Sequence, residues 1–471
     1  MDSEENSTRL PYRTALLLAI LVGPWLVFAL LYWVTPQSDE ARPLEIPARG
    51  PLTIAATGDM LIFNPLSDAE RDPALQDTIS RATFAIATLD LNLLGPDEAK
   101  AAEGRPQPRW PFGSAREAQS LRTLGFDAVA LANDHGGDYG VDGTLSTMRI
   151  LSAAGLLHAG TGTDLAQARA PVYAGVPRRL ALISVTSSSL PEARATATRA
   201  DVRGRPGVNP LRYAADITVD AGTFQTLKNS IATLNAGPPA RADELTMFGT
   251  PIRKGERTAV SFTVDENDER EILDEIKTAR TSAEAVIVSL HSHEPANASD
   301  TPSEFAQRFA RRAIDAGATL VIGHGPHRLR GIEFYNGGVI LYSLGNLVYQ
   351  TAGLDFRAAN VYDAGADLYR AAIGALGVNP QSSAAPPDDP AWWEGAIALA
   401  TIDRGRLESL RLVPVDLGGD KPLEGKGIPR IVREERATAI LRRVSELSQS
   451  LGTAVQIEAG TGLVRGNPPR Q

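Results

Sequence analysis

Residues 285–294 read AVIVSLHSHE and residues 319–327 read TLVIGHGPH, so two apolar runs end directly in histidines. Three earlier segments have a similar form: LTIAATGD at 52–59, FAIATLD at 84–90 and DAVALANDH at 127–135. Apolar runs without polar alternation are typical of strands buried on both faces of a parallel sheet. The sequence therefore predicts several buried strands that are each followed by polar side chains.

Helical patterns separate several of these strands. Residues 145–151 place Leu, Met and Leu at helical spacing before Gly155, and residues 305–313 place Phe, Phe and Ala before Gly317. Glycine commonly ends a helix because it adopts the left-handed backbone conformation at little cost. The alternation of strands with helices predicts an α/β sandwich.

The chain divides further by composition. We predict a cytoplasmic tail at 1–14, a transmembrane helix at 15–34, a polar Pro-rich stalk at 35–50, the main α/β domain at 51–350, an Ala/Pro-rich insertion at 351–390, and C-terminal strands and a helix at 391–471 that complete the domain. Within the main domain, residues 192–260 are rich in Arg, Gly and Pro and predict a long excursion that interrupts the strand–helix pattern.

The N-terminal apolar run predicts a membrane anchor. Residues 15–34 contain no charged side chain, and about 20 apolar residues match the thickness of a bilayer. Arg9 and Arg13 precede the run, which favours an N-terminus inside the cell and a main domain outside it. A cleaved signal peptide is the alternative, but the long run and the lack of a small-x-small motif after Val34 favour an uncleaved anchor. The predicted location is the bacterial cytoplasmic membrane, with a single span and an extracytoplasmic main domain.

Composition excludes several classes of function. The net charge is −9, whereas a nucleic-acid-binding surface requires a basic stripe, so we expect no nucleic-acid partner. The chain has no cysteine, which excludes disulfides, thiolate metal sites and cysteine nucleophiles. It also has no G-x-S-x-G elbow and no G-x-x-x-x-G-K-[ST] phosphate loop.

Histidine placement is the most informative feature of the sequence. Five of the 6 histidines follow predicted strands, and only His158 stands apart and is read as structural; the five are His135, His291, His293, His324 and His327. A further strand ends in Gly58-Asp59. Because ligands of α/β sheets bind outside the carboxyl ends of strands, these side chains are expected to meet in one pocket. Imidazole and carboxylate groups together predict a site for Mn, Zn or Fe.

Longer motifs carry a family resemblance. The segment 125–162, with Ala-Asn-Asp-His followed by Asp-Tyr-Gly, resembles the signature of the CapA (poly-γ-glutamate capsule synthesis) family. VIVSLHSHE, VIGHGPHRLRGIEFYNGGVILYSLGN, the opening TGDML and TLDLNLLGP resemble its other motifs, in the expected order over residues 52 to 350. The resemblance implies a fold similar to calcineurin-like metallophosphoesterases, with αββα layers, and a type II membrane anchor.

The same resemblance implies roles for individual residues. The implied ligands of one or two divalent metal ions are Asp59, Asn133, His291, His324 and His327. The implied catalytic residues are Asp134 and His135, of which His135 protonates a leaving group. Further possible site residues are Asp90, Asn92, His293 and Glu294. Two metal ions would activate a water and stabilise the charge that develops on the substrate.

One departure from the family pattern concerns the metals. The Asn-Leu-Glu element reads Asn92-Leu93-Leu94 here, so a carboxylate expected near the metals is absent. Asp90 or Asp134 would compensate for it, and Leu94→Glu is expected to raise the metal content. Without compensation, a site with one metal or none is the alternative.

Two functions remain open on the sequence. The first is a metal-dependent hydrolase that acts on a phosphoester or an amide-linked polymer. The second is a non-catalytic accessory protein for the synthesis, export or anchoring of an anionic capsule polymer such as poly-γ-glutamate. A TIM-barrel amidohydrolase is disfavoured, because its paired histidines belong on the first strand and the pair His291-x-His293 falls late in the chain.

Overall fold

The structure is a computed structural model that describes residues 44–103, 112–234, 241–247, 250–350, 389–422 and 425–466. The expected transmembrane helix at 15–34 and almost all of the insertion at 351–390 lie outside these residues. No helix in the described ranges is both long and apolar enough to cross a bilayer.

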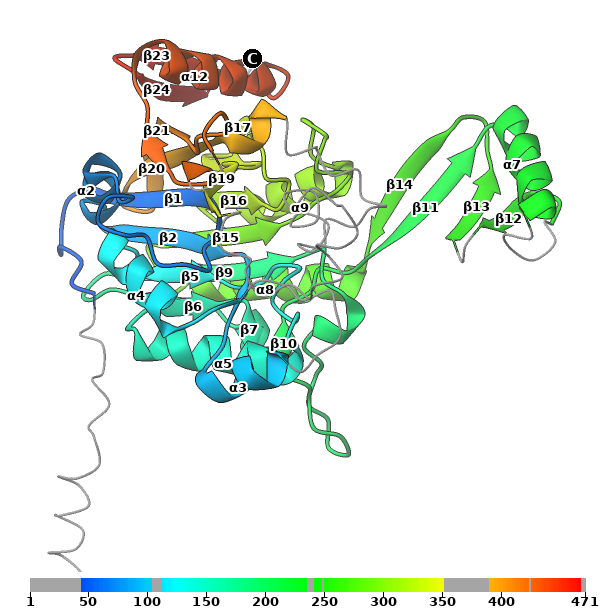
Figure 1. The fold of residues 1–471 in the computed structure, drawn as a ribbon, viewed down its shortest axis with the longest axis horizontal. Coiled ribbons are helices and arrows are strands. Elements are labelled where there is room, and N and C mark those ends of the chain that lie inside the picture. Colours follow the sequence, from blue (N-terminus) through cyan, green and yellow to red (C-terminus); the bar gives the residue numbers. More distant parts are fainter. Residues whose placement is uncertain are drawn as a thin grey trace, which may run out of the picture. The chain divides into compact units, whose positions relative to one another are not determined.

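The larger sheet has ten strands and combines strands from the N-terminal and C-terminal parts of the domain (Figure 1). Its path runs β23-β24-β21-β20-β1-β2-β5-β6, with β19 beside β1 and β22 beside β21. The bounds are β1 Leu52–Leu61, β2 Phe84–Leu89, β5 Ala128–Ala130, β6 Leu157–Ala159, β19 Asn346–Tyr349, β20 Glu394–Asp403, β21 Arg406–Asp416, β22 Arg430–Ile431, β23 Thr453–Glu458 and β24 Thr461–Gly466. Strands β1, β2, β5, β6 and β19 are parallel, so their carboxyl ends lie at one edge.

The second sheet has six strands in the order β17-β18-β16-β15-β9-β8. The bounds are β8 Val172–Ala174, β9 Leu180–Thr186, β15 Ala285–His291, β16 Leu320–His324, β17 Ile332–Tyr335 and β18 Gly338–Leu341. Strands β9, β15, β16 and β18 are parallel, and the register of β15 and β16 places His291 opposite His324.

The two sheets pack face to face through apolar side chains. Along β15, Ala285 and Ile287 join the cluster between the sheets, whereas Val286 and Val288 join the cluster under the helices. This two-residue alternation follows from the pleat, and both faces are apolar because both are covered. Outer helices complete four layers: α2 Pro73–Ser80, α4 Ala115–Leu124 and α5 Gly140–Ala153 on the larger sheet, and α8 Glu266–Arg280 and α9 Glu304–Asp315 on the smaller one. The expected α/β sandwich is therefore present.

The excursion expected at 192–260 contains regular structure of its own. Residues 213–264 form a separate four-stranded sheet with one helix: β11 Tyr213–Val219, α7 Ala221–Leu234, β12 Glu244–Met247, β13 Thr250–Lys254 and β14 Ala259–Val264. Its small core joins Val219, Leu245 and Ile252 of the strands to Phe224 and Ile231 of α7. These strands were not predicted from the sequence, because they are short and lie among Arg and Gly residues.

The C-terminal segment matches the expected two strands and helix, as β20, β21 and α12 Glu434–Gln449, and it adds the hairpin β23–β24. Smaller elements complete the described chain: β3 Asn92–Leu93, α3 Pro96–Glu103, β4 Phe112–Gly113, β7 Thr161–Gly162, α6 Leu165–Arg169, β10 Gly207–Val208 and the 3-10 turns Pro191–Ala193 and Pro390–Trp393.

Candidate metal centre

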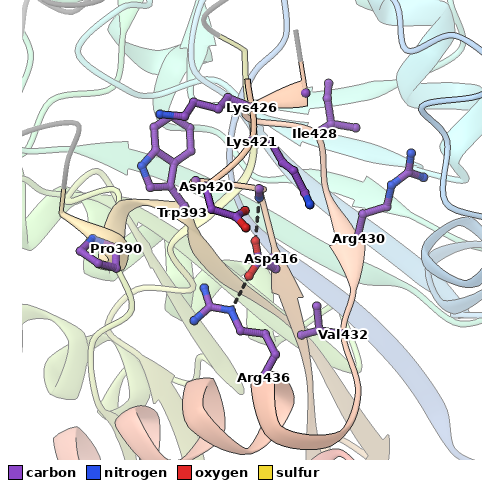
Figure 2. A pocket seen from close by; sticks show the side chains of 13 residues that line it. Pro390, Trp393, Asp416, Asp420, Lys421, Lys426, Ile428, Arg430, Val432 and Arg436 are labelled. Carbon is purple, nitrogen blue, oxygen red and sulfur yellow. Dashed lines mark hydrogen bonds and ion pairs between the residues drawn. The ribbon is translucent and has the colours of Figure 1, made fainter. Parts of the chain in front are cut away.

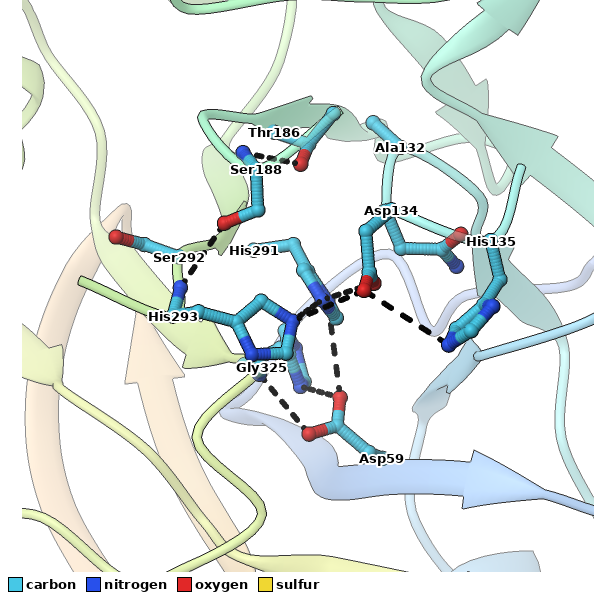
Figure 3. A network of polar contacts seen from close by, with 12 residues as sticks. Asp59, Ala132, Asp134, His135, Thr186, Ser188, His291, Ser292, His293 and Gly325 are labelled. Carbon is cyan, nitrogen blue, oxygen red and sulfur yellow. Dashed lines mark hydrogen bonds and ion pairs between the residues drawn. The ribbon is translucent and has the colours of Figure 1, made fainter. Parts of the chain in front are cut away.

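Polar side chains from both sheets meet at the carboxyl ends of the parallel strands. Asp59 lies in β1, Asp90 follows β2, and residues 133–135 follow β5. His291 and His324 are the last residues of β15 and β16. Figure 3 shows Asp134 at the centre of this group, with the rings of His135, His291 and His293 directed toward it.

Asp59 joins the two sheets. Its Oδ1 lies 3.4 Å from His324 Nδ1 and 3.9 Å from His291 Nδ1, and its Oδ2 accepts a hydrogen bond from Gly325 N at 2.9 Å. Burial alone would raise the pKa of Asp59, but His324, His291 and His327 together hold it well below its usual range. Asp59 therefore carries a negative charge in a dry environment that only cations or proton donors can satisfy.

Two glycines, Gly58 and Gly325, allow Asp59 to lie this close to the second sheet. A Cβ at Gly58 would lie 2.0 Å from Gly345 O, so any other residue would separate β1 from the turn before β19. Gly325 has φ +107°, which favours glycine, and its backbone N–H thereby points at Asp59. Gly58 therefore allows β1 to approach Gly345, and Gly325 allows a backbone N–H to reach Asp59.

Asp134 contacts three histidines. Its carboxylate lies 2.9 Å from His291 Nε2, 3.3 Å from His293 Nε2 and 3.8 Å from His135 Nε2. Burial lowers the pKa of His293, but Asp134 outweighs burial and raises that pKa to about 9. In the absence of a cation, protons on the imidazoles neutralise this cluster, so metal binding would release protons.

Several buried polar atoms of the cluster have no hydrogen-bond partner. They are Asp59 Oδ1, both carboxylate oxygens of Asp90, Asn133 Oδ1, His291 Nδ1 and both ring nitrogens of His324. Buried polar atoms are nearly always paired in folded proteins, because each unpaired one costs about 1–3 kcal/mol. An unusual concentration of such atoms in one place indicates a missing charged partner.

The donors fit a divalent cation. Within the described ranges, the groups Asp134, His291, His293 and Asp90, Asp134, His135 each bring one ligand atom per residue to within 4.8 Å of the others. Nitrogen and carboxylate oxygen donors without sulfur suit Mn, Zn or Fe. The two groups share Asp134, so together they offer ligand atoms for one ion or for two.

Three histidines are oriented by a second residue. His293 Nδ1 donates to Asn297 Oδ1 at 2.6 Å, His327 Nδ1 donates to Asn346 Oδ1 at 2.9 Å, and His135 Nδ1 pairs with Asp138 Oδ2 at 2.7 Å. Since each Nδ1 is occupied, Nε2 is left as the ring atom available to a metal or a substrate. Such partners fix both the tautomer and the ring orientation of ligating histidines.

Asn346 has the most constrained of these roles. Its side chain is fully buried, and its Nδ2 donates to the carbonyls of His327 and Trp392 at 3.2 and 3.0 Å, which leaves Oδ1 as the acceptor for His327. The ring of Trp392 also stacks on His327, with centroids 4.7 Å apart. Asn346 is therefore fixed in the orientation that holds the ring of His327.

Asn346→Ala is expected to lower the free energy of unfolding of the metal-free protein by about 1–3 kcal/mol, because it leaves two carbonyls and one imidazole N–H unpaired in the interior. Metal affinity should also fall by about 10–100-fold, as for other partners of ligating histidines. Chemical denaturation and metal titration measure the two effects. The exposed Asn229→Ala on α7 is the control, and equal effects of both variants would contradict the positioning role.

Two possible site residues have other partners in this structure. Asn92 binds Gly136 O and Thr147 Oγ1 and accepts from Tyr139 N, so it braces the loop that carries His135. The Glu294 carboxylate accepts from Ser187, Ser292 and Tyr213 hydroxyls at 2.7–2.8 Å. The hydrogen-bonding atoms of Asn92 and Glu294 are thus used by these neighbours.

Leu94 lies in an apolar environment. It packs against Tyr139, with Ala99 and Phe112 alongside. A glutamate there would be surrounded by these groups, so we now expect Leu94→Glu to destabilise the fold rather than to add a ligand. Asp90 and Asp134 supply the carboxylates of the cluster instead.

The remaining histidine lies apart, as expected. His158 is in β6, and its Nε2 lies 3.1 Å from Ser152 Oγ of α5. The residues that orient three of the histidines, Asp138, Asn297 and Asn346, were not assigned this role from the sequence. Asp138 and Asn297 could have been found from the sequence, because they lie three and four residues after the histidines that they contact. Asn346 could not, because it lies 19 residues after His327.

Comparisons with known proteins identify the family of the chain. The family described as "Bacterial capsule synthesis protein PGA_cap" matches residues 53–351. The uncharacterized protein y4sH of Sinorhizobium fredii is 32% identical over 88% of this chain and 93% of its own length. The capsule biosynthesis protein CapA of Bacillus anthracis is 26% identical, but the match covers 49% of this chain and 42% of that protein. A probable polyglutamine synthesis accessory protein of Mycobacterium tuberculosis is 30% identical over 48% of this chain and 45% of its own.

Among solved structures, a phosphatase from Mycoplasma pneumoniae covers 78% of this chain and 94% of its own, with a TM-score of 0.37 and 9% identity, a similarity too low to carry an argument about activity. The family match spans more than half of the sequence and includes every residue of the metal cluster described above. The chain belongs to the PGA_cap family of bacterial capsule synthesis proteins.

Proposed function

We propose that this chain is a metal-dependent hydrolase with a metallophosphoesterase-like site, which acts on a phosphoester or amide bond during the synthesis of an anionic capsule polymer such as poly-γ-glutamate. The observation that carries the proposal is the set of buried, unpaired carboxylate and imidazole atoms at the strand ends. A structural core has no use for so many unpaired polar atoms, whereas a cation would satisfy them together.

Divalent cations bound by Asp59, Asp134, His291, His324 and neighbouring residues would supply Lewis acidity and a water of lowered pKa. The protein's own contribution is to exclude bulk water, since Asp59, His291 and His324 are almost fully buried. His135 is the proposed proton donor to the leaving group. Asp138 holds its Nδ1, so Nε2 faces the cluster, and the pKa of His135 is well above its usual value because Asp134 and Asp138 outweigh burial.

The central test uses the purified full-length protein in detergent. Elemental analysis after dialysis should find at least one equivalent of Mn, Zn or Fe, and a chromogenic phosphodiester should be hydrolysed in a metal-dependent way. Chelation followed by re-addition of metal should abolish and then restore the hydrolysis. Protein that binds no metal under any of these conditions would sink the proposal.

An accessory role is the second candidate. The name of the Mycobacterium tuberculosis relative contains "synthesis accessory protein", and Leu94 replaces a family carboxylate. Binding of poly-γ-glutamate without turnover of any ester or amide would favour this second role.

We also propose that residues 15–34 anchor the chain with its main domain outside the cytoplasmic membrane, on the basis of the uncharged apolar run and the preceding Arg9 and Arg13. Protease added to intact spheroplasts should remove the main domain. A domain that is protected until the cells are lysed would show the orientation to be wrong.

Asp90→Asn is expected to stabilise the metal-free protein at pH 7 by about 1–3 kcal/mol and to reduce metal binding. Burial raises the pKa of Asp90 to about 6, so the folded state holds this proton more tightly than the unfolded chain does. The stability associated with Asp90 is thus complete below about pH 4 and is lost as the pH rises to about 6.

Urea denaturation of both proteins between pH 4 and 8 measures the effect. The stability difference between variant and wild type should grow over this pH range and then level off. A variant that is less stable than wild type at pH 7 would contradict the assignment of Asp90 as an unsatisfied carboxylate.

A further inference from the structure

A buried arginine lies close to the metal centre. The chain reads His327-Arg328-Leu329-Arg330, and Arg330 is only 1% exposed. Burial lowers the pKa of Arg330 to about 10, so its guanidinium is still a cation at neutral pH. A buried cation costs free energy unless its N–H groups find acceptors. The acceptors of Arg330 therefore indicate what this residue does.

Arg330 binds one segment of backbone. Its guanidinium donates three hydrogen bonds of 3.1–3.2 Å to carbonyls within residues 294–299, namely those of Glu294, Ala296 and Ser299. Arg328 adds a bond to the carbonyl of Ala298 in the same segment, at 2.9 Å. Residues 294–299 belong to no helix or strand, so their shape depends on such side-chain contacts.

The choice of carbonyls as acceptors distinguishes Arg330 from other arginines of the domain. Arg436 of α12, for example, pairs with the carboxylate of Asp416 at the end of β21 (Figure 2). A guanidinium presents its donors in a fixed planar fork that can reach several carbonyls, whereas an ammonium presents its donors from one point. Arg330 thus shapes the backbone of residues 294–299 rather than neutralising a carboxylate.

The segment that Arg330 holds carries the partner of a histidine in the metal cluster. Asn297 is 3% exposed and accepts a hydrogen bond from His293 Nδ1 at 2.6 Å. This bond directs Nε2 of His293 toward Asp134, whose carboxylate lies 3.3 Å away (Figure 3). The orientation of His293 therefore depends on the position of Asn297, and hence on the carbonyls that Arg330 binds.

Arg330 is also near two further histidines of the cluster. It lies three residues after His327, whose ring packs against that of His293 with centroids 5.7 Å apart. With His324 it lines a small buried cavity of about 10 Å³. The segments that carry these three histidines therefore meet around one guanidinium.

We infer that Arg330 is a positioning residue of the metal centre. It fixes the backbone of residues 294–299, and Asn297 in that segment holds the ring of His293 toward Asp134. This inference rests on the proposed function, because it assigns a role in metal binding. Arg330 acts on metal affinity through His293, so its effect should disappear when the imidazole of His293 is removed.

A double-mutant cycle on the full-length protein in detergent tests this dependence. Wild type, Arg330→Lys, His293→Gln and the double variant are stripped of metal by chelation and titrated with cobalt(II), whose visible absorption reports binding. Arg330→Lys keeps the charge but loses the fork that reaches three carbonyls. It should weaken cobalt binding by about tenfold in the wild-type background and by less than about twofold in the His293→Gln background.

Arg169→Lys is the matched control for a general loss of stability. Arg169 is also buried, at 4% exposed, but its ion pairs are with Asp268 and Glu271 of α8. The control should unfold at a lower urea concentration than wild type while its affinity for cobalt stays within about twofold.

Asn297→Ala removes the contact with His293 and leaves Arg330 in place, so it tests the same inference even if Arg330→Lys does not fold. Its effect on cobalt affinity should likewise disappear in the His293→Gln background. Equal losses of affinity in the two backgrounds, or an equal loss in the Arg169→Lys control, would overturn the inference while leaving the metal site intact. A wild-type protein that binds no cobalt would overturn the proposed metal site and, with it, this role of Arg330.

Discussion

Asp59→Asn is expected to remove most of the bound metal and to lower hydrolysis of a phosphodiester by at least a hundredfold. Among the residues that the structure describes, Asp59 is the one carboxylate within 4 Å of both His291 in β15 and His324 in β16, and it is almost fully buried. The amide keeps the size of the side chain but loses the charge that offsets a dication. Loss of a charged ligand from a site with few ligands should reduce affinity severely.

Elemental analysis after dialysis and turnover under metal saturation measure the two effects. His158→Gln is the matched control, because His158 is the histidine outside the cluster and contacts Ser152 instead. The control should retain metal and activity. If Asp59→Asn keeps a full complement of metal after dialysis, Asp59 is not a ligand and the geometry around it needs another explanation.

His135→Gln is expected to lower the rate of hydrolysis by about 10²–10⁴-fold while metal content stays within about 20% of wild type. The reason is that His135 is placed to donate a proton, with Nε2 toward the cluster and Nδ1 held by Asp138. Loss of this donor slows departure of the leaving group. A substrate whose leaving group needs no proton, such as a nitrophenyl ester, should therefore be affected much less than an alkyl ester.

The ratio of the hydrolysis rates of these two esters distinguishes a proton donor from a metal ligand. His135 also belongs to the group with Asp90 and Asp134 that could hold an ion. If His135→Gln lowers turnover of both esters equally and metal content falls with it, His135 is a ligand. Asp138→Asn should reproduce the effect in weaker form, because it frees the ring to rotate without removing it.

The fold class and the gathering of polar side chains at one edge of the sheets were predictable from the sequence, for a local reason. A buried parallel strand needs a continuous apolar run, and a polar residue directly after the run must lie at the edge where strands of a parallel sheet end. Asp59 near the end of β1, His135 after β5, and His291 and His324 at the ends of β15 and β16 could therefore be expected at one edge without any knowledge of strand order. His158 lies within a short strand and was correctly set apart.

Other features depend on contacts between distant segments, which local patterns do not encode. Leu94 occupies a motif position next to Asn92, yet its side chain turns to Tyr139, 45 residues further along the chain. The sheet of residues 213–264 depends on pairing of β11 with β13 and β14, and its short strands give little periodicity to detect.

The sequence by itself therefore determined which residues end strands, and hence which chemistry collects at one edge of the sheets. Only the tertiary structure decided how those residues pair. Asn346 holds His327 because β19 lies beside β1, and Asp90 rather than Leu94 supplies a carboxylate because the chain turns after β2. The physical reason is that periodicity reports the burial of each strand, whereas side-chain partners depend on register and crossing between strands far apart in the chain.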